Sequence, residues 1–356
     1  MVRLYCCQFR FRRIAFSLTS AMISCALVAQ DNYDLERARR RAREGYVDDQ
    51  LRLAYAFQSG AGVRKDPAES ARWFLQAANQ GNPEAQTDLG YAYVHGEGVP
   101  LDFHEAFKWF QRAALSNYAP AQNDLGLLLI QGLGTTRDIS AGVNWVTRAA
   151  HQGLAAAQLH LGLFYLNGIG TAPDGHEALE WIRKAAKKEY PAAELALGMI
   201  YEAGQGVAPD MEQAAHWYRK AADRGHRSAQ NNPGHLYEKG IGVQQDFTQA
   251  IHWYSLAANQ GELMAWQNLA RVYAGASSLT PDNNAAYFWA RVTASAAPDR
   301  AQKNWPAFVE LLRQRLSPGD AQRIEARAEQ WIQEHRSELK GDGELIFASI
   351  ASGSRH

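Results

Sequence analysis

The residue types in this sequence that could do chemistry recur at a fixed spacing. One Asp returns every 36 residues, at Asp66, Asp102, Asp138, Asp174, Asp210, Asp246 and Asp282. Carboxylates in this number could act as catalytic acids. Each one, however, stands where a helix is expected to begin, and a carboxylate there accepts hydrogen bonds from the free N–H groups of the first turn. We therefore predict that these residues are helix caps.

Other patterns of catalysis and ligand binding are absent from the sequence. Glycine pairs such as Gly96 and Gly98 follow helices rather than strands, and they lack the Lys-Ser/Thr of a phosphate-binding loop. The 11 His residues include no His-Glu-x-x-His, and there is no Gly-x-Ser-x-Gly elbow. We therefore predict no catalytic residue, no metal site and no cofactor, and we interpret the glycine pairs as turns.

The elements that position these residues are pairs of helices. Pro83 after Asn82 is typical of a first helical turn, and Gly96 ends this first helix because glycine adopts a left-handed conformation easily. A second helix begins at Asp102, and Glu105 three residues later predicts a reciprocal capping box. Each helix carries an apolar stripe at helical spacing. The stripe residues are Ala85, Leu89, Ala92 and Tyr93 in the first helix and Ala106, Trp109, Phe110 and Ala113 in the second.

The helix pair repeats along most of the chain. A Trp returns with the same period, at Trp73, Trp109, Trp145, Trp181, Trp217, Trp253 and Trp289. A fixed period of this length indicates a repeat protein in which each repeat packs on its neighbours. The large Trp side chains, beside small Ala residues, are expected to fill the gaps between repeats. Seven repeats of 36 residues then occupy residues 45–296.

The repeat that begins at Gly81 resembles the Sel1-like repeat, a relative of the tetratricopeptide repeat found in exported bacterial proteins. The matching residues are Gly81-Asn82-Pro83-Glu84-Ala85, Gly96-Glu97-Gly98-Val99, Asp102, Trp109-Phe110 and Ala113-Ala114, in seven copies of one register. The resemblance implies an all-α fold, a right-handed α/α superhelix (solenoid) of two-helix repeats. It also implies a scaffold that binds other proteins. Some secreted relatives have Cys-rich repeats and are proposed to act on β-lactams, but no Cys lies within the repeats here.

The two ends of the chain depart from the repeat. Residues 1–29 combine four Arg with an uncharged stretch and small residues, which is typical of a secretory signal peptide. We expect an N-terminal capping helix at 30–44, capping helices at 297–340 and a flexible tail at 341–356. The alternative for the Arg-rich stretch 37–43 is contact with anionic lipid or polysaccharide.

Removal of the leader changes the charge and the cysteine content. Four of the 37 basic residues and all three Cys lie in residues 1–29, which leaves 33 basic against 37 acidic residues. A chain with net negative charge is not expected to bind nucleic acid, and without Cys it has no disulfide. We expect a monomer in the periplasm or secreted. The alternative is a lipoprotein that associates with a membrane through an acylated Cys25.

Function is expected on the side of the first helices that packing leaves free. Residues at the positions of Tyr91 and Val94 point away from the apolar stripe and are again apolar in the next repeats. Trp266 stands where most repeats have Gln or Glu, and an exposed Trp is a typical binding contact. The candidate partner-binding residues are Tyr91, Val94, Leu127, Ile130, Leu163, Leu166, Met199 and Trp266.

These residues predict a groove on a concave wall that binds a peptide or helix of a protein partner in the envelope or the host. Burial of part of the groove by neighbouring first helices is the alternative. We interpret the chain as a non-catalytic protein–protein interaction scaffold. The other interpretation is a hydrolase that acts on cell-wall material or β-lactams, or a carbohydrate-binding protein, and it requires polar or acidic groups that converge in a pocket.

One residue breaks the pattern inside the repeats. Pro233 replaces the Leu that other first helices have at Leu89, Leu125, Leu161 and Leu197. Proline in a helix interior removes a hydrogen bond and clashes with the preceding turn. We predict that this helix is kinked or restarts with Asn232 as its cap. The break would be either a hinge or a tolerated defect.

Overall fold

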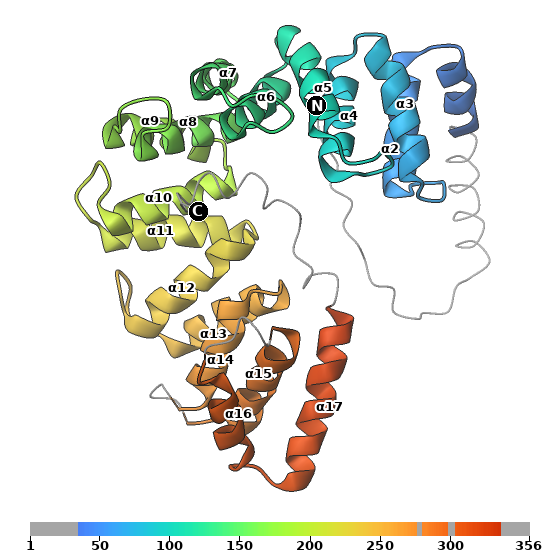
Figure 1. The fold of residues 1–356 in the computed structure, drawn as a ribbon. Coiled ribbons are helices and arrows are strands. Elements are labelled where there is room, and N and C mark those ends of the chain that lie inside the picture. Colours follow the sequence, from blue (N-terminus) through green and yellow to red (C-terminus); the bar gives the residue numbers. More distant parts are fainter. Residues whose placement is uncertain (1–34, 276–279, 298–302, 336–356) are drawn as a thin grey trace, which may run out of the picture. The chain divides into compact units, whose positions relative to one another are not determined.

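The protein is helical throughout the residues that the structure describes. The computed structural model describes residues 35–275, 280–297 and 303–335, and no strand occurs in these ranges (Figure 1). Residues 35–43 are helical. The helices that follow are α2 (Val47–Ser59), α3 (Pro67–Asn79), α4 (Pro83–His95), α5 (Phe103–Leu115), α6 (Ala119–Gln131), α7 (Ile139–His151), α8 (Ala155–Asn167), α9 (Gly175–Ala186), α10 (Pro191–Ala203), α11 (Met211–Asp223), α12 (Arg227–Lys239), α13 (Phe247–Asn259), α14 (Leu263–Tyr273), α15 (Asn283–Ala296), α16 (Trp305–Arg313) and α17 (Pro318–Glu334).

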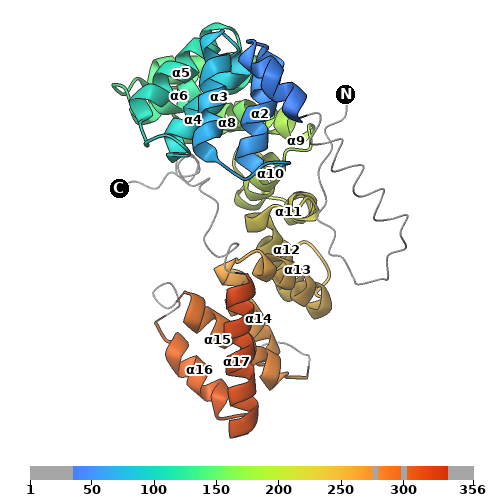
Figure 2. The ribbon, with the colours of Figure 1, turned by 90° about the vertical axis from the view of Figure 1, so that its right-hand side faces the viewer.

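The contacts between helices divide the chain into two bodies. The N-terminal body ends at Ser116 and the C-terminal body begins at Asn117. The even-numbered helices from α2 to α14 are the first helices of the repeats, and the odd-numbered helices from α3 to α15 are the second. In the C-terminal body, α7, α9, α11 and α13 each pack between the first helix of their own repeat and that of the next (Figures 1 and 2).

The seven periodic Asp residues cap the second helices, as predicted. Each accepts a hydrogen bond from a backbone N–H of the first turn, for example Asp66 Oδ1 from the Glu69 N–H at 3.1 Å. The other bond of the expected capping box, from the Asp102 N–H to the Glu105 side chain, is not formed, so that part of the prediction is wrong. The Asp102 N–H donates instead to the Tyr93 carbonyl at 3.0 Å, and this bond back to the first helix recurs in every repeat. Because the N–H of the cap is already satisfied, Glu105 is left to pair with a nearby lysine.

The glycine pairs form the turns inside each repeat. Gly96 ends α4 with φ 68°, and Gly98 has φ 75°. A Cβ on Gly98 would lie 2.0 Å from the Pro67 carbonyl oxygen, so this glycine lets the turn approach the start of α3 in the preceding repeat. A Cβ on Gly242 would lie 2.2 Å from a carbonyl oxygen of α11 in the same way. The interpretation of these glycines as structural turns is confirmed.

Small and large side chains alternate between neighbouring repeats. Both residues of every Ala-Ala pair from Ala77–Ala78 to Ala257–Ala258 are buried. Trp253 belongs to one core cluster with Ala221 and Ala222, the pair of the preceding repeat. Trp181 lies in the same way with the Ala pair of the repeat before it. At these positions the prediction that Trp fills the gap between repeats is confirmed.

Helix α12 continues through Pro233. It runs unbroken from Arg227 to Lys239 with His226 at its N-cap, so the predicted restart at Asn232 is wrong. Pro233 is buried, and a Cβ on the next residue, Gly234, would lie 2.6 Å from the ring of a Tyr in α13. The kink stays a prediction.

Further helices pack on the first and last repeats. Leu35 and Ala42 are buried in one core cluster with Leu53 of α2. Leu312 of α16 and Ile324 of α17 are buried in the core cluster that includes α15. The expected leader at 1–29 and the tail at 341–356 lie outside the described residues. Within the described part of the chain, no helix has both the length and the apolar character that crossing a membrane requires.

Candidate functional site

The first helices of the C-terminal body carry a series of equivalent residues whose exposure differs from repeat to repeat. We define the first-helix face by one residue of each repeat, in the order Leu127, Leu163, Met199, His235 and Arg271. Exposure rises along this series: Leu127 is 1% exposed, Leu163 is half-buried and Met199 is 56% exposed. His235 and Arg271 are also exposed. The face is therefore closed and apolar at α6 and accessible from α10 to α14.

Half of the predicted partner-binding residues are inaccessible. Four of them are buried, so the expectation that they line an open groove is wrong: Val94, Leu127, Ile130 and Trp266. Three others are half-buried: Tyr91, Leu163 and Leu166. Met199 is the one exposed member of the set. Tyr91 and Val94 belong to the N-terminal body, and the others belong to the C-terminal body.

The positions equivalent to Val94 and Ile130 face the second helix of their own repeat. Ile130 lies against α7, where a Cβ on Gly142 would be 2.6 Å from its Cγ1. In α12 the equivalent residue is Glu238, which accepts a hydrogen bond from the Tyr254 hydroxyl at 2.8 Å. The residue equivalent to Tyr254 in the repeat of Ile130 is Val146. The first-helix position is Ile130 or Glu238, and the second-helix position that it contacts is Val146 or Tyr254. The two positions change together from apolar to polar because their side chains touch within one repeat.

Trp266 is buried because it stands at a position where other first helices have a glutamine that hydrogen-bonds to a backbone carbonyl. In four other first helices the Gln side chain donates to the carbonyl eight residues earlier; these residues are Gln50, Gln86, Gln158 and Gln230. Trp266 Nε1 makes the same bond, to Ala258 O at 3.0 Å. Its ring also lies 6.1 Å from that of Trp331 in α17. The predicted exposed contact is part of the core.

The side-chain oxygen of the glutamine at this position accepts a hydrogen bond from the side chain of another glutamine, which lies at the end of the second helix. The donor–acceptor pairs are Gln80–Gln50, Gln152–Gln122 and Gln260–Gln230, at 2.7–2.8 Å. We call these two sets of bonds the amide ladder. In the repeat of α10 and α11 the pair is ionic: Arg224 Nε donates to both oxygens of Glu194 at 3.1 Å. Glu194 is fully buried, so the guanidinium provides its compensating charge.

Two rungs of the amide ladder are incomplete. The Oε1 atoms of Gln86 and Gln158 are buried and accept no hydrogen bond from the described residues. In the repeat of Gln158, the position that should supply the donor holds Lys188, whose ammonium binds the Gly153 carbonyl instead.

Polar residues on the first-helix face bridge neighbouring first helices. Asn123 Oδ1 in α6 contacts His160 Nδ1 in α8 at 2.8 Å, while Asn123 Nδ2 donates to Asp124 at 2.9 Å. Because an amide oxygen only accepts, Nδ1 of His160 carries a proton. Burial lowers the pKa of His160 to about 4, so the ring is neutral at neutral pH.

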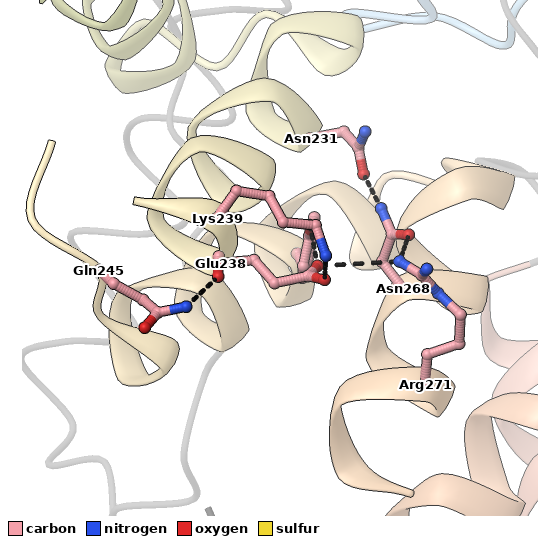
Figure 3. Close-up of polar contacts among 7 residues, drawn as sticks. Asn231, Glu238, Lys239, Gln245, Asn268 and Arg271 are labelled. Carbon is pink, nitrogen blue, oxygen red and sulfur yellow. Dashed lines mark hydrogen bonds and ion pairs between the residues drawn. The ribbon is translucent and has the colours of Figure 1, made fainter. Parts of the chain in front are cut away.

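A larger bridge surrounds Glu238, which is 3% exposed (Figure 3). Its carboxylate accepts hydrogen bonds from Tyr254 at 2.8 Å and from Lys239 at 2.7 Å. Arg271 Nη2 lies 3.7 Å away. Burial alone would raise the pKa of Glu238, but the hydrogen bonds from Lys239 and Tyr254 and the charge of Arg271 lower it below its usual value.

This bridge leaves positive charge at the surface. Arg271 also donates to Asn268 Oδ1 at 2.8 Å, and Asn268 Nδ2 donates to Asn231 at 3.0 Å, which joins α12 to α14. The side chains of Lys239 and Arg271 remain 47% and 44% exposed. Two cations therefore surround one buried carboxylate, and both cations keep room for a further anionic partner.

In the N-terminal body, Tyr55 of α2 bridges to two carboxylates of α4. Its hydroxyl lies 2.9 Å from Glu84 Oε1 and is also within hydrogen-bond distance of Asp88 Oδ2. Burial, with the nearby charge of Glu84, raises the pKa of Asp88 to about 6 although the bond to Tyr55 lowers it. One hydroxyl proton cannot serve two carboxylates at once, so below its pKa of about 6 a protonated Asp88 would donate to the Tyr55 hydroxyl and complete the chain of bonds.

These groups do not support hydrolysis. A cavity of about 60 Å³ beside Asp88 is much smaller than the roughly 300–1,000 Å³ of an ordinary ligand pocket. The described residues hold no group of three or more His, Cys, Asp or Glu side chains that could bind a metal. The converging acids Glu84 and Asp88 are instead joined through Tyr55.

The repeat pattern decides the family. The Sel1 repeat model matches residues 47–82, 83–118, 119–154, 155–190, 191–226, 227–262 and 267–296. The chain belongs to the Sel1 repeat family. Sel1 repeats generally serve as scaffolds for protein–protein interactions.

Solved structures of Sel1 repeat proteins have the same fold. A protective antigen of uropathogenic Escherichia coli with an SLR fold is 30% identical and aligns with a TM-score of 0.64, over 89% of this chain and 71% of its own. A Sel1 repeat protein from Oxalobacter formigenes is 34% identical with a TM-score of 0.61, over 78% of this chain and 79% of its own. No curated protein matches the chain significantly. The all-α, solenoid-like class of tandem two-helix repeats is therefore shown.

Sequence reasoning missed the bridge around Glu238 in this Sel1 protein. His235, Glu238 and Arg271 are recognisable as polar replacements in an apolar series. The signal that could have revealed their contacts is the joint change of the partner position, where an aliphatic residue becomes Tyr254.

Proposed function

We propose that this Sel1 repeat protein is a non-catalytic scaffold that binds a segment of another protein on its first-helix face, in the cell envelope or after secretion. Met199 carries this proposal. It is 56% exposed, whereas the other apolar residues predicted for binding are covered by their neighbours wholly or in part. A flexible, polarizable Met is suited to contact apolar side chains of varied shape.

The surroundings of Met199 suit a peptide rather than a flat protein surface. Leu163 of α8, half-buried, lies on one side of it in the series of the face, and His235 of α12 lies on the other. An apolar side chain of the partner would bury Met199, while polar groups of the partner would meet His235 and Arg271. A bound segment would then run across several first helices, as peptides do in helical grooves.

Site-specific crosslinking tests the location of binding. A photo-reactive residue in place of Met199 is expected to give discrete adducts when the protein is produced in its native cells. A matched probe replaces Leu115, which is 71% exposed at the end of α5, a second helix. Equal adduct patterns from both positions, or none from position 199, contradict the proposal.

A charge at the same position tests its importance. Met199→Asp is expected to lower partner capture by about tenfold or more, because a carboxylate must lose water to enter an apolar contact. Leu115→Asp is the control and should retain capture. Both variants should keep the helical circular dichroism of the parent, since both positions are exposed.

Export is the second part of the proposal and rests on residues 1–29. We expect the protein from native cells to lack these residues and to be found in the periplasm or the medium, as a monomer. Mass spectrometry of the mature N-terminus checks this, and Cys25→Ala tests acylation as the route to a membrane. A cytosolic protein that keeps its first residues contradicts export.

A further inference from the structure

We propose that the chain carries its own ligand for the first-helix face: residues 342–350 bind across α14, α12 and α10 and occlude Met199. The binding itself stands independently of the function proposed above. Its consequence, competition with a protein partner, rests on that function.

The accessible part of the first-helix face has two chemical zones. Toward the C-terminal end, Lys239 and Arg271 are each nearly half exposed, and the one carboxylate that they share is buried. This zone attracts a carboxylate, because it holds two cations for one anion. Toward α10 the face becomes apolar, with Met199 exposed and Leu195 half-buried.

The last residues of the sequence have the matching chemistry in the matching order. Asp342 and Glu344 come first, and Leu345, Ile346 and Phe347 follow directly. Acidic residues would meet the cationic zone of α12 and α14, and the apolar residues would then reach α10. The acidic residues precede the apolar residues in the segment, just as the cationic zone precedes the apolar zone along the face when it is followed from the end of α17.

The structure fixes where this segment departs. Trp331 in the last turns of α17 lies 6.1 Å, ring to ring, from Trp266 in the first turn of α14. Arg315, just before α17, donates to the Ala274 carbonyl at the other end of α14. Helix α17 thus ends beside the start of α14, where Met264 is 48% exposed.

The connecting residues are long enough for the contact. Six residues lie between His335 and Asp342, and the seven steps of an extended chain that join the two span roughly 24 Å. Side chains of α14 reach α12 directly: Asn268 donates to Asn231 at 3.0 Å, and Arg271 lies 3.7 Å from Glu238, the residue before Lys239. The acidic residues can reach Lys239 without displacement of α17.

Methionine methyl groups give a direct test. The chain from residue 30 contains Met199, Met211 and Met264, and these can be labelled with ¹³C at the methyl carbon. We expect deletion of residues 336–356 to shift the Met199 and Met264 signals. Met211, half-buried on a second helix, is the internal control and should not move. A synthetic peptide of residues 340–352, added to the shortened chain, should return both signals toward their original positions.

Charge variants test the register. Lys239→Gln should weaken binding of the peptide by about 1.5-fold to fivefold, which is the range for one exposed ion pair. Lys187→Gln, an exposed lysine at the end of α9, should leave the affinity unchanged. A peptide with Asp342→Asn and Glu344→Gln should bind more weakly to the parent and respond less to Lys239→Gln.

The outcomes separate this inference from the proposed function. Met199 and Met264 signals that are identical with and without residues 336–356, and insensitive to the peptide, overturn it, even if crosslinking at position 199 still captures a partner. Docking of the peptide, with no partner crosslink at position 199 even after deletion of residues 336–356, supports it and refutes the scaffold role. If both hold, deletion of residues 336–356 should raise the crosslinking yield at position 199 severalfold.

Discussion

The amide ladder shows how single residues change while a bond is kept. Trp266 supplies an N–H in place of the Gln side chain, and Glu194 keeps its two acceptors because Arg224 replaces the usual amide donor. The sequence reveals that Trp266 stands at a Gln position. It does not reveal the acceptor, because a carbonyl eight residues earlier is brought near only by the turn between two helices. An unusual residue therefore looked like a binding contact.

The incomplete rung at Gln158 leads to a stability prediction. Lys188→Gln should increase the free energy of unfolding by about 0.5–1.5 kcal/mol, because the new amide can donate to the unsatisfied Gln158 Oε1. Gln260 already makes this bond to Gln230 at 2.8 Å and also reaches Gly225 O. Urea unfolding followed by circular dichroism measures the effect. Lys187→Gln removes the same charge and should change little; an equal gain in both variants would mean that charge, not the hydrogen bond, is responsible.

Asp88 should make stability depend on pH. Its pKa is about 6 in the folded protein and near the usual 3.8 when unfolded, so between pH 4 and 6 the folded state binds more protons. The stabilising contribution is intact below about pH 4 and is lost as pH rises through 6. Relative to Asp88→Asn, the parent should lose about 1–3 kcal/mol of unfolding free energy between pH 4 and 7. Urea unfolding at both pH values checks this, and the same loss relative to Asp48→Asn, an exposed site, contradicts it.

At the scale of helices, the sequence predicts which elements form better than which sides they expose. Periodic Trp, Asp and Gly residues set the two-helix repeat, and the structure confirms the caps and the turns. The helical wheel correctly places Val94 and Ile130 away from their own stripe. It cannot show that the second helix of the same repeat covers them, because a first helix is contacted on more than one side. Only a narrow strip, marked by Met199, stays open.

The second glycine of a turn should tolerate no side chain where it meets the backbone of the preceding repeat, as Gly98, Gly206 and Gly242 do. Gly98→Ala is expected to lower the unfolding free energy by about 3 kcal/mol or more, since the methyl group meets Pro67 O and the backbone is strained at positive φ. Gly81→Ala isolates the strain, because Gly81 has φ 88° and no atom within 4 Å of an added Cβ. That variant should lose only about 1 kcal/mol. Equal losses in urea unfolding would show that the close approach is not a constraint.

At the scale of the whole molecule, the stability of a repeat protein depends on how its end repeats are covered. Trp331 of α17 packs against Trp266, Phe288 and Trp289, with ring centroids 5.4–6.5 Å apart. The sequence predicts these capping helices from their apolar stripes. It could not predict that the cap meets the first helix and the second helix of the last repeat together, since no periodic partner exists beyond the array.

Removal of this cap should expose the aromatic cluster. A chain that lacks residues 303–356 is expected to bind a hydrophobic dye, to self-associate and to unfold at a lower temperature. A chain that lacks only residues 336–356 keeps α16 and α17, so it should stay monomeric and lose far less thermal stability than the chain without residues 303–356. Light scattering after size-exclusion chromatography measures association. A monomeric, dye-negative chain without residues 303–356 contradicts this view of the cap.

The amide ladder has a consequence for how such a chain can grow. Each ladder bond that needs two matched side chains stays inside one 36-residue repeat: Gln50–Gln80 lies within 47–82, and Glu194–Arg224 lies within 191–226. Each ladder bond that crosses between repeats ends on a backbone carbonyl, which every residue supplies. Duplication or loss of a whole repeat at these boundaries therefore leaves no ladder side chain without its partner. The ladder bonds alone therefore allow the repeat to be copied as a unit, whereas the bridges Asn123–His160 and Asn231–Asn268 pair specific side chains of two different repeats.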